Sequence, residues 1–248
     1  MLYDNLLDIL KHTHGLGFIE TVKLKGENGE THLEALSQEN SVIFFGKLSN
    51  SIPELDGHTV GLGRMGILNG YVNFGAFKDN QGSTAINTQS KGTTSIPAEI
   101  TFTTPEGHNS FYRFMSEAVV NNAVNVPPFK GATWDFDLVP TKKNLKDLQY
   151  FSQILGTYEG TFNVTIDNGN MILGVGTQGN DRAVIPFATN INASMPDTFR
   201  WPLLEVINVL KLSDTSKSCK MKFSSKGLLC VEITSGLGEY NYYLPART

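Results

Sequence analysis

A stripe of polar side chains recurs at helical spacing between residues 142 and 155. The stripe follows the pattern i, i+4, i+7 and i+11 and consists of Lys142, Lys146, Gln149 and Gln153. Leucines occupy the opposite face at core spacing, so an amphipathic helix is predicted here. Lysines attract a phosphate backbone, and amides add hydrogen bonds that do not read bases. The stripe therefore predicts loose, sequence-independent contact with nucleic acid.

A glycine motif offers a competing, enzymatic interpretation. Gly61, Gly63 and Gly66 match the dinucleotide-binding pattern literally. That pattern requires a buried strand before it, a long helix after it and an acidic residue about 20 positions on. Residues 51–58 are polar and turn-like, and no βαβ pattern surrounds the motif. A helix over 60–68, loosened by its glycines, is expected instead.

Candidate metal and catalytic residues form incomplete sets. Asp135 and Asp137 alternate on a predicted strand, and His12 and His14 end the first helix, but no third ligand accompanies either pair. No nucleophile motif accompanies the other histidines. We therefore expect no catalytic residue, no bound metal and no cofactor, and a protein that is not an enzyme.

Charge is distributed unevenly along the 248 residues. Residues 1–125 hold eight Lys or Arg against thirteen Asp or Glu, whereas residues 126–248 hold twelve against eleven. A local basic face is enough for nucleic-acid contact, so the overall charge of −4 does not exclude it. Without a signal peptide or an apolar membrane span, an intracellular location is expected, in the host cytoplasm if the protein is viral. Cys219 and Cys230 are expected on opposite faces of neighbouring strands, both reduced.

The order of predicted elements repeats once along the chain. Each half has a helix, strands, a second helix and more strands, and Phe18 and Phe162 mark equivalent positions 144 residues apart. The first half is expected to contain a helix over 2–14, strands over 18–24, 32–36 and 42–48, a second helix over 60–68, and strands over 70–77, 98–103 and 110–119. The second half is expected to contain a helix over 142–155, strands over 161–166, 171–175 and 182–187, a helix opened by Pro202, and strands over 217–223, 228–234 and 240–244. Domains are predicted at 1–120 and 141–248, joined by a connector at 121–140.

Three segments carry a resemblance to a known family: 168–173 through 179–187, the helix within 199–212, and the ending Tyr242-Tyr243-Leu244-Pro245-Ala246-Arg247. With the duplication, they resemble the DNA sliding clamps of archaea, eukaryotes and large tailed phages. The resemblance implies an α+β clamp fold whose two pseudo-repeated domains each pack two helices on antiparallel sheets. It implies a homotrimeric ring around double-stranded DNA that binds a DNA polymerase and a clamp loader, and not a membrane. The second helix of the first half has only a weak helical signal, and this departure from the family pattern favours a phage as the source.

The resemblance also assigns residues by position. The DNA-facing set is Lys11, Arg64, Lys142, Lys143, Lys146, Gln149, Gln153 and Lys211. A pocket for partner peptides is assigned to Phe129, Leu228, Tyr243, Pro245 and Ala246. The subunit interface is assigned to two edge strands, with Phe111, Tyr112, Arg113 and Phe114 on one and Arg182, Ala183, Val184 and Ile185 on the other. Lys11 is expected to attract DNA weakly because Asp4 and Asp8 share its exposed side.

A second class of function stays open. A β-rich structural or assembly protein of a virion would show the same duplication without a DNA-encircling role. A duplex-stimulated gain in polymerase processivity separates the two.

Overall fold

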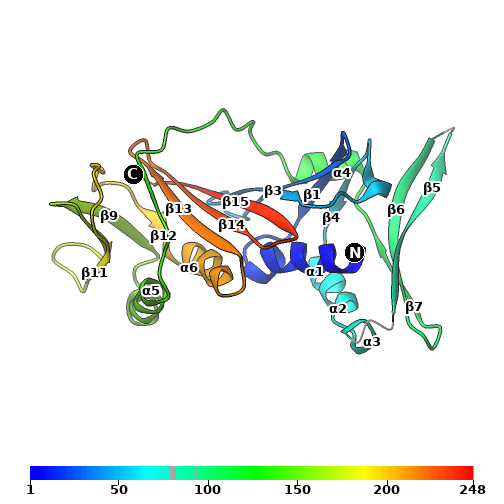
Figure 1. Cartoon of the computed structure of the whole chain (residues 1–248), viewed down its shortest axis with the longest axis horizontal. Helices are drawn as coiled ribbons and strands as arrows, with labels where there is room; N and C mark the ends of the chain where they lie inside the picture. Colours follow the sequence, from blue (N-terminus) through cyan, green and yellow to red (C-terminus); the bar gives the residue numbers. More distant parts are fainter. Residues whose placement is uncertain (79–81, 93, 248) are drawn as a thin grey trace. The chain divides into compact units, whose positions relative to one another are not determined.

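The computed structural model describes residues 1–78, 82–92 and 94–247, which divide into two compact units (Figure 1). Unit 1 comprises residues 1–40, 44–127 and 236–239, and unit 2 comprises residues 41–43, 128–235 and 240–248. No helix among the described residues is both long enough and apolar enough to cross a membrane.

Unit 1 contains two antiparallel arrangements of strands and four α-helices among its described residues. Its strands run in the orders β4-β1-β2-β3 and β5-β6-β7. The elements are α1 (Leu2–His12), β1 (Val22–Glu27), β2 (Glu30–Leu36), β3 (Ile43–Leu48), β4 (Thr59–Leu62), α2 (Met65–Val72), α3 (Gly75–Lys78), β5 (Ser83–Lys91), β6 (Thr94–Thr103), β7 (Asn109–Arg113) and α4 (Glu117–Ala123). Short 3-10 helices, η1 (His14–Leu16) and η2 (Pro53–Leu55), follow α1 and precede β4.

Unit 2 repeats this plan with two longer helices. Its strands run in the orders β12-β9-β10-β11 and β15-β14-β13-β8. The elements are β8 (Phe136–Leu138), α5 (Lys142–Leu155), β9 (Thr161–Asp167), β10 (Asn170–Val175), β11 (Ala183–Ala188), β12 (Trp201–Pro202), α6 (Leu203–Lys211), the 3-10 helix η3 (Leu212–Asp214), β13 (Ser218–Ser224), β14 (Leu228–Thr234) and β15 (Gly238–Pro245).

The two units are structural repeats, as the order of predicted elements indicates. β4-β1-β2-β3 corresponds to β12-β9-β10-β11, and β5-β6-β7 corresponds to β13-β14-β15. In each unit the two main helices pack together, α1 with α2 and α5 with α6. The equivalent hairpins turn through Asn28-Gly29 and Asn168-Gly169, and all four residues have positive φ. Two-residue turns with positive φ match the twist of paired strands, which explains Asn-Gly at both places.

The first half departs from its predicted elements in several places. The helix expected over 60–68 is wrong for its first part, because β4 occupies 59–62 and α2 starts only at Met65. The strand expected over 70–77 is wrong, since this segment is helical in α2 and α3. Its aromatic residues looked strand-like, but Tyr71 and Phe77 pack on Phe102 of β6, with ring centroids 5.8 and 5.7 Å apart.

Two strand boundaries in the first half also need correction. The predicted strand over 110–119 ends at Arg113, and residues 117–123 form α4, so the start of the expected connector is helical. Ser116 in extended conformation and Glu117 in the first turn provide an N-terminal helix boundary. β1 begins at Val22 rather than at Phe18.

The glycine motif is explained by packing inside unit 1. A Cβ at Gly61 would lie 2.6 Å from Val120 Cγ2, and one at Gly63 would lie 2.7 Å from Met115 Sδ. Gly61 and Met115 also exchange two backbone hydrogen bonds, of 3.0 and 2.8 Å. Gly61 and Gly63 therefore let the segment around α4 approach β4. Gly66 differs, because a Cβ added there in α2 would meet no neighbouring atom within 4 Å.

This difference predicts opposite effects of two alanine substitutions. Gly61→Ala should destabilise unit 1 by about 1–3 kcal/mol, because the new methyl group forces Val120 to move. Gly66→Ala should be neutral or stabilise by up to about 1 kcal/mol, because alanine is the better helix former. The denaturant concentration at the unfolding midpoint measures the stability of each variant. Equal midpoints for the two variants would contradict the packing explanation.

Helix α5 has the bounds predicted for it, and its sequence fixes its position. Thr141 accepts a hydrogen bond of 3.1 Å from the Asn144 backbone, and Asn144 Oδ1 accepts one of 2.9 Å from the Thr141 N–H. This reciprocal capping box satisfies two backbone donors of the first turn. Asn144 Nδ2 also donates to the Phe187 carbonyl at 2.9 Å, which ties the start of α5 to β11. Leu145, Leu148 and Leu155 are buried.

Candidate functional site

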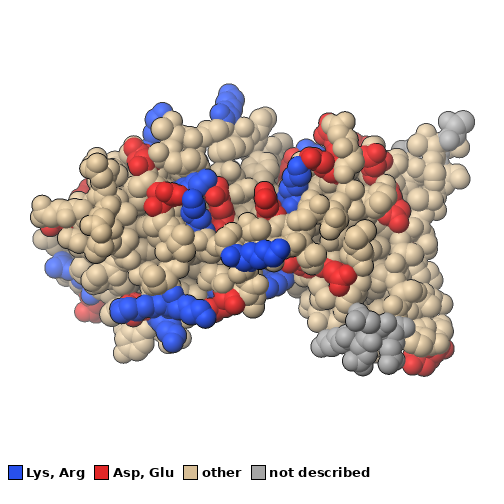
Figure 2. All heavy atoms as spheres, viewed as in Figure 1, with Lys and Arg blue, Asp and Glu red and all other residues tan. Residues whose placement is uncertain are grey.

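The polar stripe of α5 lies on the surface of unit 2. Lys142, Lys146 and Gln153 are exposed, and Gln149 is half-buried. Figure 2 shows Lys and Arg atoms gathered over this helix. With the leucine face buried, α5 presents two ammonium groups and two amides to solvent, as the helical periodicity predicts.

Lys143 differs from its neighbours on α5. Its ammonium group forms an ion pair with Asp147, one turn along the helix, and the side chains are 82% and 33% exposed. A pair at this spacing on a surface contributes little stability, but it offsets the charge of Lys143 locally. Lys143 is therefore a weaker candidate for phosphate contact than Lys142 or Lys146.

Lys211 lies on the second helix of the same unit. It is exposed in the last turn of α6, and its Nζ donates to Asn208 Oδ1 at 3.0 Å. Because α5 and α6 pack together, the cations on both helices belong to one helical layer of unit 2.

Unit 1 offers fewer cations on its helices. Lys11 is exposed in the last turn of α1. Arg64 is exposed but precedes α2, with φ of 47°, so its expected place on the second helix is wrong. Asp8 does not share the exposed side with Lys11: it is buried, and its Oδ1 lies 3.3 Å from His12 Nδ1. The spacing i and i+4 on a face that packs inward explains this contact.

The strands assigned to a subunit interface are β7 and β11. Each lies at the end of its strand order, β5-β6-β7 and β11-β10-β9-β12. Pro186 within β11 fits an edge position, because proline has no N–H to donate and is tolerated where one side of a strand is unpaired.

The assigned side chains alternate between exposed and buried; Phe114 directly follows β7, and Arg182 directly precedes β11. Phe111 is 55% exposed and Val184 is 60% exposed, and Arg113 and Arg182 are exposed as well. The four remaining assigned side chains are buried in their own units: Tyr112, Phe114, Ala183 and Ile185. Tyr112 donates from its hydroxyl to the Gly63 carbonyl, and burial raises its pKa to about 12. These four residues can offer backbone groups to a partner strand, but not side chains.

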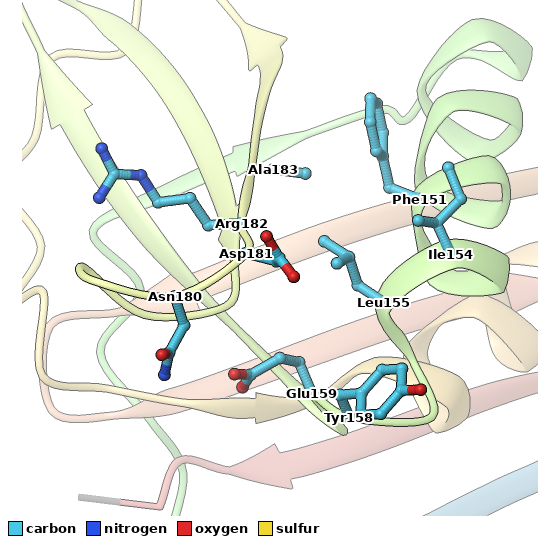
Figure 3. A pocket seen from close by; sticks show the side chains of 9 residues that line it. All are labelled: Phe151, Ile154, Leu155, Tyr158, Glu159, Asn180, Asp181, Arg182 and Ala183. Carbon is cyan, nitrogen blue, oxygen red and sulfur yellow. The ribbon is translucent and has the colours of Figure 1, made fainter.

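A pocket of about 540 Å³ opens beside the start of β11 (Figure 3). Phe151, Ile154, Leu155 and Tyr158 line it from the end of α5 and the residues after it, and 180–183 line it from the other side. Ile154 is 51% exposed and Tyr158 is 85% exposed. The sequence analysis does not predict this apolar surface, although Tyr150 and Ile154 at i and i+4 form a second apolar line on α5, and Tyr158 follows the helix.

The aromatic residues assigned to a peptide pocket lie together in unit 2. The ring centroids of Phe129 and Tyr243 are 4.4 Å apart, and those of Tyr243 and Trp134 are 6.4 Å apart. Phe129 remains 45% exposed. The sequence analysis does not assign Trp134 to this group, although a large aromatic residue in the expected connector is a candidate for such a contact. The connector therefore provides two of the three rings.

The C-terminal residues join this surface through the β13–β14 turn. The Ala246 N–H donates to the Gly227 carbonyl at 2.7 Å, which places Ala246 beside Leu228. Leu228 and Ala246 are half-buried, and Pro245 is exposed. Tyr243 lies near Cys230 and Glu232 of β14, and burial together with these neighbours raises the pKa of Tyr243. Leu228, Cys230 and Glu232 alternate along β14 and therefore share one face of the strand.

The two aspartates considered as metal ligands have partners within the chain, and the two cysteines are buried apart from each other. Asp135 Oδ2 accepts from the Ser225 N–H at 2.7 Å, and Asp137 pairs with Lys220 at 2.6 Å, which lowers the Asp137 pKa. Cys219 is opposite Ile233 and Cys230 is opposite Lys222, so the thiols lie on different faces of the sheet. Both cysteines are free and buried, and burial raises the pKa of each to about 12.

Two solved structures share this architecture over nearly the whole chain. One is a PCNA2–PCNA3 complex from Sulfolobus tokodaii, with a TM-score of 0.64 and 10% identity, covering 98% of this chain and 96% of that one. The other is A. fulgidus PCNA bound to the C-terminal region of FEN-1, with the same TM-score and coverage and 8% identity. The chain has the fold of the DNA sliding clamps. No protein-family model and no curated protein sequence matches it.

The clamp fold explains the duplication and confirms the α+β class. Two repeated units, each with a pair of packed helices, are what the predicted element order required. At 8–10% identity the likeness concerns the backbone, so the role of each side chain depends on its own surroundings in this chain.

Proposed function

We propose that this protein is a DNA sliding clamp, a ring-forming scaffold that encircles duplex DNA and tethers a DNA polymerase for processive synthesis. The observation that carries the proposal is the clamp fold over 98% of the chain. In the proposed role the protein binds DNA and a polymerase without changing either chemically, so the role requires no catalytic side chain. Phage origin and a clamp loader as a further partner belong to the same proposal.

DNA contact is assigned to the helices. Lys142 and Lys146 have exposed ammonium groups on α5, Gln149 and Gln153 extend their stripe, and Lys211 adds a cation from α6. These groups attract phosphates without reading bases, so a duplex of any sequence is an equivalent ligand. Lys11, Arg64 and Lys143 play supporting roles. Weak individual contacts suit a protein that must slide.

Assembly is assigned to β7 of one copy and β11 of the next. Pairing would satisfy backbone groups that an unpaired edge leaves exposed. Phe111 and Val184 supply exposed apolar side chains for the contact, and the pocket beside β11 supplies a further apolar surface through Ile154 and Tyr158. Two complementary edges at different places on one chain make a head-to-tail contact, which closes into a ring when the rotation allows. Three two-unit subunits give the proposed homotrimer.

Partner binding is assigned to the surface formed by Phe129, Tyr243, Leu228, Pro245 and Ala246. The A. fulgidus clamp was solved with the C-terminal region of a partner protein, which supports a peptide as the ligand class. Exposed Phe129 and Pro245, with half-buried Tyr243, Leu228 and Ala246, give an apolar site in which a few anchors dominate affinity.

A double substitution tests this site. Pro245→Glu with Ala246→Glu should lower affinity for a C-terminal peptide of the cognate polymerase at least about 100-fold, because two charges then face the apolar anchors. The oligomer should stay intact. Fluorescence anisotropy with the labelled peptide measures the change.

The matched control is Ser218→Glu, an exposed charge at the opposite end of β13. It should leave peptide affinity unchanged. Equal affinity for the wild type and a folded Pro245/Ala246 variant would place the partner site elsewhere.

A further inference from the structure

A second pocket adjoins the proposed peptide site in unit 2. It has a volume of about 510 Å³ and lies between the connector and the β13–β14 turn. Lys130 and Thr133 line it from the connector, and Ser224, Lys226 and Leu228 line it from the other side. Leu228 also belongs to the proposed peptide site, so the two surfaces are continuous.

The charge in this pocket is entirely positive among its lining residues. Lys130 and Lys226 are both exposed, and no carboxylate pairs with either ammonium group in the part of the chain that the structure describes. Nearby Asp135 directs its Oδ2 to the Ser225 N–H at 2.7 Å.

The neighbouring lysines of the same sheet provide a contrast. Lys220 pairs with Asp137 at 2.6 Å, and Lys222 pairs with Glu232 at 2.6 Å. Their charges are therefore offset within the chain. The ammonium groups of Lys130 and Lys226 can therefore bind a negatively charged ligand.

We propose that this basic pocket binds carboxylate side chains of the partner peptide, adjacent to the apolar anchors. The inference rests on the proposed peptide site and specifies its ligand: an acidic residue flanks the Leu or aromatic anchor. An ammonium group at the rim of an interface acts mainly on encounter rate and partner choice, so the acidic residue selects partners while the anchors hold them. Leu228 belongs to both the pocket and the proposed peptide site, and Lys130 directly follows Phe129, which favours a peptide over DNA phosphate as the source of negative charge.

Selection from a displayed library of random peptides tests the inference on the full-length protein. The wild type should enrich peptides with Leu or aromatic anchors and, next to them, Asp or Glu by about threefold or more over the library. The charge-reversed variant Lys130→Glu/Lys226→Glu should enrich Lys or Arg at those positions instead. Synthetic acidic peptides from the wild-type pool should bind this variant about 3- to 20-fold more weakly.

The matched control is Lys142→Glu/Lys146→Glu, which carries the same charge change on α5. It should select the same acidic peptides as the wild type. Apolar anchors without acidic neighbours, or acidic enrichment that persists in Lys130→Glu/Lys226→Glu, would overturn the inference and leave the peptide site standing. A pool insensitive to Pro245→Glu/Ala246→Glu would overturn the peptide site itself.

DNA binding gives the remaining outcome. The affinity of each variant for a duplex of about 30 base pairs is compared. If Lys130→Glu/Lys226→Glu loses as much affinity as Lys142→Glu/Lys146→Glu and its peptide selection is unchanged, the pocket contacts phosphate and the inference is wrong. The expected result is a much smaller loss of duplex binding than in the α5 variant.

Discussion

In the proposed trimer, Val184→Asp should separate the subunits into monomers at micromolar concentration. Val184 is 60% exposed on the edge strand β11, so the substitution should leave unit 2 folded. In the proposed interface the new carboxylate would be desolvated without a partner, a cost that exceeds the energy of a modest interface. Light scattering after size exclusion should show the mass fall from three times 27.2 kDa to 27.2 kDa.

Val139→Asp provides the control, because Val139 is 68% exposed and lies outside both edge strands. It should remain trimeric. Ile185 is unsuitable for this experiment, since its side chain is 1% exposed and a charge there would disrupt the core of unit 2. A Val184→Asp variant with the mass of a trimer, or a wild type with the mass of a monomer, would contradict the proposed assembly.

Lys142→Ala with Lys146→Ala should strongly reduce processive synthesis. Removing two phosphate contacts should lower the salt dependence of duplex binding by about two units, whatever the DNA sequence, because each lysine releases about one counterion. Loading and processivity should fall more than equilibrium affinity. The product length of a single binding event on primed DNA measures the effect.

Lys143→Ala is the matched control on the same helix. The Lys143 ammonium group is already paired with Asp147, so its removal should change both readouts much less. Normal processivity of the Lys142/Lys146 variant at about 0.15 M salt would show that this face of α5 does not meet DNA.

The second half of the chain was predictable because its local signals agree. Helix α5 has the predicted bounds, with leucines at core spacing and a capping box at its start. Strand β14 also has its predicted bounds, and the Asn168-Gly169 turn separates β9 from β10 as expected.

The first half was less predictable because tertiary contacts decide its conformation. Gly61 and Gly63 weaken any helical preference, and their role becomes visible only when Met115 and Val120 pack against them. The aromatic residues of 70–77 suit a strand by propensity, but packing on Phe102 holds them in helices.

The site residues divide in the same way. Periodicity identified the stripe of α5, since exposure on a helix follows from spacing. The ion pair of Lys143 with Asp147 is local, at i and i+4 on the same helix, so helical spacing also makes it possible. Periodicity could not identify the buried position of Tyr112 or the contact of Trp134 with Tyr243, because each depends on residues brought together by the fold. The peptide surface came from the resemblance of the C-terminal segment, and the structure adds the neighbouring lysines.

If the protein encircles DNA as a ring, its retention on a linear duplex should depend on whether it is added before or after the DNA ends are blocked. Protein is added either before or after both DNA ends are blocked with streptavidin, and retention is then measured at about 0.5 M salt, where phosphate contacts are greatly weakened. We expect retention only when the protein is added first, because a closed ring can thread over a free end but not over a blocked one. Retention that is the same in both orders would contradict encirclement.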